Sequence, residues 1–268
     1  MKKILTMMMV VVLSISMLAG CGGTKTTGSV ATDDSTSMEK VIGALGEAFQ
    51  NDTDISFTYN PTGSGSGIKA VQEGRCDIGL SSRALKEEEA SAGLTGTVLA
   101  YDGIAVIVNP ENPVSDLDVE TIARIYTGEI TNWSELGGND APVAALGREP
   151  GSGTRGAFEE IVGVEDACVY AAEYSSTGDV IGNVASNPNA IGYASLSSVD
   201  ESVKAAAVNG VACTEDTVKD GSFPIQRPFL MVAKEGAELS EAAQTFLNYS
   251  MSAEVAELIA AAGAVSPN

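Results

Sequence analysis

Apolar residues recur along this chain with two periods, which predict alternating strands and helices. Residues 55–59 alternate between apolar and polar side chains, as a half-buried strand requires. Residues 38–49 place apolar side chains three and four positions apart, which predicts a helix with one buried face. The same reasoning predicts strands at residues 77–80, 104–108, 143–146, 191–196 and 225–232, and helices at residues 68–74, 119–126, 157–162, 180–184, 242–247 and 253–261. This alternation indicates an α/β protein with largely parallel sheets.

Small residues with hydrogen-bonding groups precede three of these helices. Residues 147–155 read Gly-Arg-Glu-Pro-Gly-Ser-Gly-Thr-Arg, residues 63–67 read Gly-Ser-Gly-Ser-Gly, and residues 35–37 read Ser-Thr-Ser. The first amides of a helix have no partner within it and lie at the positive end of its dipole, so they can bind a small anion. Taken singly, each segment is better explained as an ordinary helix cap.

The positions of these serines favour a common site. Ser64, Ser82 and Ser152 all follow predicted strands. Ligands of open α/β sheets bind beyond the carboxyl ends of the strands, so we expect these side chains to converge on one anion. Thr36 and Glu39 have the spacing of a capping box at the start of the helix at residues 38–49.

The first twenty residues predict an export signal, because two lysines precede an apolar stretch that ends in small residues. A transmembrane anchor is the competing interpretation, but the uncharged stretch is at the short limit for one. Residues 18–21, Leu-Ala-Gly-Cys, resemble a bacterial lipoprotein box, which implies that Cys21 is lipidated and anchors the protein outside the cytoplasmic membrane. Residues 21–32 are rich in Gly, Thr and Ser and are expected to form a flexible tether.

Composition removes several classes of function. The chain has 268 residues, 36 of them acidic and 15 basic, and without the two lysines of the export signal its net charge is −23. Such a surface repels nucleic acid, and an anion site on it has to act through oriented, short-range donors. The chain has no histidine, which excludes a Ser-His-Asp triad, a Cys-His pair and the usual zinc sites that contain histidine. We expect no metal and no cofactor.

Three cysteines remain once Cys21 is assigned to the lipid. Cys76, Cys168 and Cys213 are an odd number, which cannot form a complete disulfide framework. A bond between Cys168 and Cys213 is conceivable, but three buried free thiols are the expectation.

An ordered series of segments over nearly the whole mature sequence gives the most specific signal. The segments are residues 35–37, 63–67, 74, 77–79, 81–83, 131–133, 148–158, 190–193 and 227–228. In this order they resemble the phosphate-binding proteins of bacterial phosphate ABC transporters, which are extracytoplasmic receptors with two lobes and a cleft. The resemblance implies a two-lobed, periplasmic-binding-protein-like α/β fold with an interdomain cleft. Lobe one would comprise residues 33–110 and 225–268, and lobe two residues 111–224.

The resemblance also implies ligand contacts and a partner. The contacts carried over from the family are Thr36, the backbone amide of Ser37, Ser64, Arg148, Ser152, Gly153 and Thr154. Arg148 would supply the one full positive charge. A monomeric receptor of this kind closes its lobes on inorganic phosphate and delivers it to the permease subunits of an ABC transporter for uptake, without enzymatic activity.

Position 82 departs from the family pattern. Many members carry an aspartate there, which accepts a hydrogen bond from a protonated phosphate oxygen. Ser82 can still accept, but it lacks the negative charge that rejects sulfate, so sulfate, molybdate and tungstate stay open as ligands. Its neighbour Arg83 could pair locally with Asp77 or Glu87 or approach the cleft, and the local pair is the favoured expectation.

Two other classes of function stay open. A phosphate-sensing surface module would use the same lobes without transport. A phosphoesterase with Ser64 or Ser152 as nucleophile is disfavoured, because the chain lacks histidine and its glycine-rich loops lack the Gly-Lys-Ser/Thr ending of a P-loop. Trp133, Phe158 and Tyr193 are expected to pack in the core, because a tetrahedral anion offers no flat face for stacking.

Overall fold

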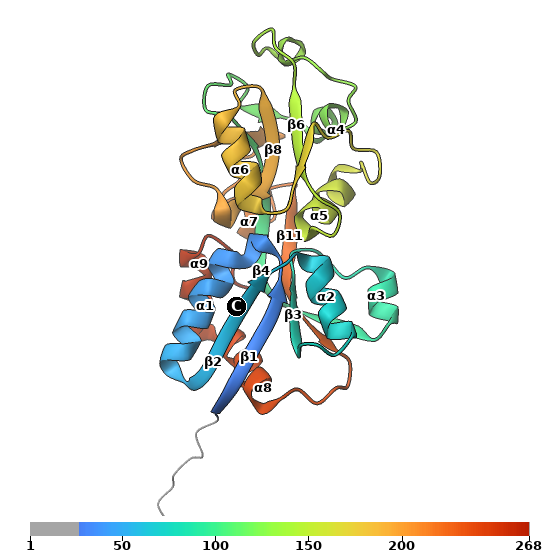
Figure 1. Cartoon of the computed structure of the whole chain (residues 1–268). Helices are drawn as coiled ribbons and strands as arrows, with labels where there is room; N and C mark the ends of the chain where they lie inside the picture. The colour runs from blue at the N-terminus through green and yellow to red at the C-terminus, as the bar shows by residue number, and fades with distance from the viewer. Residues whose placement is uncertain (1–26, 268) are drawn as a thin grey trace, which may run out of the picture.

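The computed structural model describes residues 27–267 as two lobes arranged end to end (Figure 1). The predicted export signal, Cys21 and residues 22–26 lie outside the described residues. The first lobe contains the strands β1 (Thr27–Asp34), β2 (Asp54–Pro61) and β3 (Ile78–Ser81) and the helices α1 (Glu39–Asp52), α2 (Ser64–Gln72), α3 (Glu87–Ser91), α8 (Glu241–Ser250) and α9 (Ala256–Ala261), with the short 3-10 helices η1 (Thr36–Met38) and η4 (Ala253–Val255).

The second lobe is inserted between the two parts of the first. Its strands are β5 (Asp116–Leu117), β6 (Ala144–Arg148), β7 (Ala172–Tyr174), β8 (Ala190–Ser195), β9 (Lys204–Ala205) and β10 (Ala207–Val208). Its helices are α4 (Val119–Tyr126), α5 (Gly153–Val162), α6 (Thr177–Ser186) and α7 (Glu215–Lys219), with the 3-10 helices η2 (Trp133–Leu136) and η3 (Leu196–Ser198).

Two long strands join the lobes. The chain passes from the first lobe to the second along β4 (Leu94–Val108) and returns along β11 (Gln226–Lys234). The first part of β4 pairs with β11, and its last five residues pair with β8 in the second lobe. The lobes therefore share one sheet with the strand order β2-β1-β3-β11-β4-β8-β6-β7, and β9 also pairs with β4.

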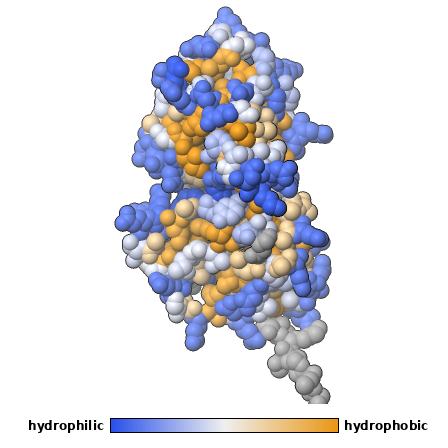
Figure 2. All heavy atoms as spheres, turned by 180° about the vertical axis from the view of Figure 1, so that it is seen from behind, coloured by the Kyte–Doolittle hydropathy of each residue, from blue (hydrophilic) through white to orange (hydrophobic). Residues whose placement is uncertain are grey.

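Each lobe has its own hydrophobic core. One cluster is formed by α1, α8, α9 and the strands of the first lobe, with Phe49 and Phe246 in edge-to-face contact. The other surrounds β8 and the end of β4 and includes the stacked pair Phe158 and Tyr193. Trp133 is buried in this second cluster and donates its indole N–H to the Asn189 carbonyl, so all three aromatic residues pack as predicted. Hydrophilic residues occupy the constriction between the lobes on the face in Figure 2.

Every predicted helix and strand overlaps an observed one, but two expectations about the sheet were wrong. Residues 27–32 of the predicted tether form most of β1, which pairs in parallel with both β2 and β3. Backbone hydrogen bonds on both sides and the burial of Val30 hold this strand, although its composition is poor in apolar residues. The sheet is also mixed rather than largely parallel, because the outgoing strand β4 and the returning strand β11 run antiparallel.

Cys76, Cys168 and Cys213 form no disulfide among the described residues, as expected, but their burial is less complete than predicted. Cys213 is buried, whereas Cys76 and Cys168 are partly exposed. Within residues 27–267, we find no helix with the length and apolar character needed to cross a lipid bilayer.

Candidate functional site

Hydroxyl groups from both lobes meet at the junction between them. Ser37 on η1 of the first lobe contacts Thr154, at the start of α5 in the second lobe, through its hydroxyl. Its hydroxyl oxygen also lies 3.3 Å from the Thr177 hydroxyl at the start of α6. Thr36 accepts a hydrogen bond from the Thr177 amide at 3.3 Å. All four side chains are at most 8% exposed, so the lobes exclude water from these groups.

Thr36 does not form the predicted capping box. The N-cap of α1 is Met38, which has no side-chain cap, and the turn before it is capped by Ser35. The 3-10 helix η1 delays the start of α1 by one turn, so the Thr36 hydroxyl faces the second lobe instead.

A second group of hydroxyls lies on the first lobe beside the start of α5. The Ser64 oxygen accepts the Ser82 amide at 3.0 Å and lies 3.4 Å from the Ser82 hydroxyl, which is itself 2.7 Å from that of Ser35. Ser64, Ser82 and Ser35 are buried to 2% exposure or less. Gly153 of the second lobe approaches so closely that an added Cβ would come within 2.6 Å of the Ser82 oxygen.

The two glycine-rich loops are also joined through their backbones. The amide of Gly65, in the first turn of α2, donates to the Gly151 carbonyl before α5 at 3.0 Å. Two predicted anion sites on different lobes therefore lie side by side, and both present helix N-termini to the same region.

Arg148 is a buried cation held by neutral groups. Its guanidinium donates to the carbonyls of Tyr174 and Ser175 and to the Thr177 hydroxyl, at 3.1, 2.8 and 3.0 Å. Arg148 is 2% exposed, and it takes part in none of the ion pairs among the described residues. Burial lowers the pKa of Arg148 to about 10, which is still well above neutral pH. The site thus contains a full positive charge whose counter-charge is not supplied by a paired carboxylate.

Ser152 is an ordinary helix cap, as the sequence suggested for its segment taken singly. It is the N-cap of α5, and its hydroxyl accepts the Arg155 amide at 3.3 Å. This bond satisfies one of the free amides of the helix and leaves those of Gly153 and Thr154 at the open end.

Sequence reasoning missed two residues of this site. Thr177 follows two serines and precedes a glycine, so the α6 start is a fourth segment of the same kind, and its composition could have revealed it. Arg227 lies on β11 and donates to the Ser82 hydroxyl at 3.3 Å and to Asp102. An isolated arginine in a strand carries no periodic signal, so only the resemblance drew attention to its segment.

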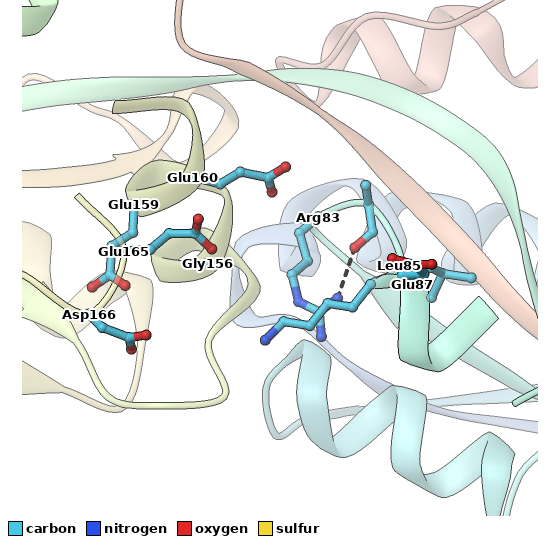
Figure 3. Close-up of a pocket in the computed structure, with 10 residues that line it drawn as sticks. Arg83, Leu85, Glu87, Gly156, Glu159, Glu160, Glu165 and Asp166 are labelled. Atoms are coloured by element: carbon cyan, nitrogen blue, oxygen red, sulfur yellow. Dashed lines mark hydrogen bonds between the residues drawn. The ribbon is translucent and has the colours of Figure 1, made fainter. Parts of the chain in front are cut away.

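A cavity of about 410 Å³ opens between the lobes next to this site (Figure 3). Arg83 and Lys86 of the first lobe line one side, and acidic residues of the second lobe line the other, namely Glu159, Glu160, Glu165 and Asp166. Arg83 is paired locally, as expected, but with Glu89 rather than Asp77 or Glu87, and both guanidinium–carboxylate distances are 2.7 Å. Figure 3 shows the acidic side chains on the opposite side of the gap from Arg83, with that of Glu160 extending toward it, whereas Glu159 pairs with Arg155 of its own helix.

The fold and the site together define a class of protein. Two lobes joined by a pair of crossing strands, with helix N-termini and a buried cation where they meet, are the architecture of a two-lobed solute-binding protein. A family model described as a PBP superfamily domain matches residues 20–254.

The chain belongs to the PstS family of phosphate-binding proteins within this superfamily. It is 32% identical to the phosphate-binding protein PstS of Bacillus subtilis over 244 residues, which is 89% of this chain and 80% of the relative. A phosphate ABC transporter substrate-binding protein from Clostridium perfringens, solved with bound phosphate, is 44% identical with a TM-score of 0.86 over 90% of this chain and 100% of that one. An ABC-type phosphate transport receptor from Vibrio cholerae is 33% identical with a TM-score of 0.75 over 89% and 100%.

Proposed function

We propose that this protein binds inorganic phosphate outside the cytoplasmic membrane and delivers it to an ABC permease for uptake. The observation that carries the proposal is the arrangement around Arg148, a buried guanidinium without a paired carboxylate, among hydroxyls and helix N-termini from both lobes. The similarity to phosphate-binding relatives along nearly the whole chain supports the same conclusion.

The proposed site uses the residues that the sequence singled out. Thr36, Ser37, Ser64 and Ser82 would contact the anion from the first lobe. Arg148, Ser152, Gly153 and Thr154 would contact it from the second, with the α5 amides at the positive end of a helix dipole. The hydroxyl pairs that now bridge the lobes would open to admit the ion and then donate to its oxygens.

Closure of the lobes follows from this division of donors. Neither lobe alone can satisfy four phosphate oxygens, so the ion binds more tightly to the closed arrangement and shifts the population toward it. We propose residues 33–110 with 225–268 and residues 111–224 as the two lobes. The crossing strands β4 and β11 are where the chain would bend, and the cores on either side would move as units.

The anchoring and the partner are part of the same proposal. A lipid on Cys21 would hold the protein at the outer face of the membrane as a monomer, near the permease subunits that accept its phosphate. The relatives are binding proteins, and we propose that this chain acts without catalysis.

Calorimetric titration of the mature chain with orthophosphate tests the proposal. We expect one phosphate per chain, and Arg148→Ala should weaken binding roughly tenfold to a hundredfold because a charge-assisted bond is lost. Arg124→Ala is the matched control, since Arg124 pairs with Glu129 on the surface of the second lobe. A wild-type chain that binds no phosphate, or an Arg148→Ala variant with unchanged affinity, would contradict the proposal. Competition with sulfate in the same cell tests the alternative oxyanions that Ser82 leaves open.

A further inference from the structure

A second arginine lies on the first-lobe side of the proposed phosphate site. The side chain of Arg227 is 1% exposed, and its Nη1 donates to the Ser82 hydroxyl at 3.3 Å. Ser82 in turn lies within 3.4 Å of Ser64, so this guanidinium reaches the group of hydroxyls that faces Gly153 and α5.

The other side of this guanidinium is bound to a buried carboxylate. Its Nε and Nη2 donate to the same Asp102 oxygen at 3.0 and 2.9 Å, and the other Asp102 oxygen accepts the Ser195 hydroxyl at 2.7 Å. Both carboxylate oxygens are therefore engaged, and Nη1 is the guanidinium nitrogen that reaches Ser82 rather than Asp102.

The two arginines of the site act on each other. Arg227 is among the charges that lower the pKa of Arg148, after burial, which has the largest effect. Burial likewise lowers the pKa of Arg227 and raises that of Asp102, while their mutual attraction opposes both shifts. Two guanidinium groups that repel each other in a water-free region are both stabilised by an anion between them.

We propose that Arg227 is a ligand-binding residue, the second cation of the oxyanion site, and that Asp102 holds it and attenuates its charge. This inference rests on the proposed phosphate function. It assigns to Arg227 a direct hydrogen bond to a phosphate oxygen beside Ser82. A doubly charged anion then lies between Arg148, at the end of β6 in the second lobe, and Arg227, on the joining strand β11.

A purely structural ion pair is the competing explanation. A buried pair can be replaced by neutral residues of similar volume at little cost, whereas removing one partner leaves an uncompensated charge. The two explanations therefore predict different phosphate affinities for two kinds of variant, one in which Asp102 is neutralised and one in which both charges are removed.

Asp102→Asn gives the first arm of the test, by calorimetry with orthophosphate and by thermal melting. Without ligand this variant should melt at a lower temperature than wild type, because Arg227 loses its counter-charge. Its phosphate affinity should rise by about tenfold, because the positive charge next to the ion is no longer attenuated. Unchanged or weaker affinity in the folded variant overturns the proposal.

The second arm is the double variant Asp102→Asn with Arg227→Met, which removes both charges and keeps the volume. It should fold, and it should bind phosphate about tenfold more weakly than wild type, a smaller loss than that of Arg148→Ala. The matched control is the double variant Arg124→Met with Glu129→Gln, which removes both charges from an exposed ion pair of the second lobe. This control should bind phosphate with wild-type affinity. Wild-type affinity in the Asp102–Arg227 double variant assigns the pair a structural role only and overturns the proposal.

The outcomes also separate this inference from the function on which it rests. If the wild-type chain binds no phosphate, the proposed function fails and this inference fails with it. If wild type binds and Arg148→Ala does not, but the double variant behaves as wild type, only the role of Arg227 is refuted.

Discussion

The two arginines of the site are held in different ways, and this difference decides what each residue can contribute. Arg148 donates to two carbonyls and one hydroxyl, so its whole charge is available to an anion. Arg227 shares its charge with Asp102 and presents one edge to Ser82. Substitution of Arg148 should therefore cost more affinity than substitution of the Asp102–Arg227 pair as a unit.

Substitution of Gly153 tests how closely the two lobes approach each other. An added Cβ would overlap the Ser64 hydroxyl and come within 2.6 Å of that of Ser82. Gly153→Ala should therefore keep the lobes apart and weaken phosphate binding at least about tenfold by calorimetry, while leaving each core intact.

Gly182→Ala is the control for this substitution, because a Cβ on that α6 glycine meets nothing within 4 Å. It should raise the free energy of unfolding by roughly 0.5–1 kcal/mol through helix propensity and leave affinity unchanged. Equal affinities for the two alanine variants would contradict the close contact between the lobes.

At the residue scale, the sequence predicted local features better than distant ones. Arg148, Ser152 and Thr154 stand in one short segment, so their proximity follows from the sequence itself. The Thr36 capping box was wrong because the extra turn of η1 cannot be seen in residue spacing. Asp102 and Arg227 are 125 positions apart, and only the pairing of β4 with β11 brings them together.

At the scale of elements, one carboxylate both caps the short helix α3 and pairs with an arginine. Glu89 accepts the Lys86 amide at the start of the helix and both guanidinium nitrogens of Arg83. Burial acts to raise the pKa of Glu89, but these hydrogen bonds outweigh it and hold the pKa below its ordinary value. The ionised group therefore stabilises the fold above its unfolded pKa, and this contribution disappears as pH falls through the lower folded value.

Glu89→Gln tests this dependence on pH. At pH 7 the variant should unfold with about 1 kcal/mol less free energy than wild type, and the difference should shrink as the pH falls and acid protonates the wild-type carboxyl. Glu88 is exposed on the same helix, and Glu88→Gln should have the same free energy of unfolding as wild type throughout this pH range. A difference between Glu89→Gln and wild type that stays the same from neutral to acidic pH would show that charge is not involved.

The period of apolar residues predicted the longer helices and strands well, because these helices bury one face and these strands a half or a whole. It did not detect the short helix α3, which has no buried residue. It failed at β1, because backbone hydrogen bonds to the strands on both sides stabilise β1 and few apolar side chains are needed. It also detected only the apolar end of β4, because residues 95–97 of that strand are exposed and the polar Asp102 interrupts its buried part.

At the scale of the whole molecule, the charge and the division into lobes act together. The chain carries a net charge of −21, so phosphate is not attracted from a distance and its capture depends on enclosure by short-range donors. Small-angle X-ray scattering should show a smaller radius of gyration when phosphate saturates the wild-type chain. Arg148→Ala should keep the larger value at the same phosphate concentration, and a radius that does not respond to phosphate in wild type would argue against closure.

A crystal structure of the mature chain grown with orthophosphate is the most direct test of the central claim. We predict one tetrahedral ion between the lobes, bonded to Arg148 and to the amides at the start of α5 on one side, and to Ser37 and Ser64 on the other. An ion bound elsewhere, or held by donors from one lobe alone, would contradict this account.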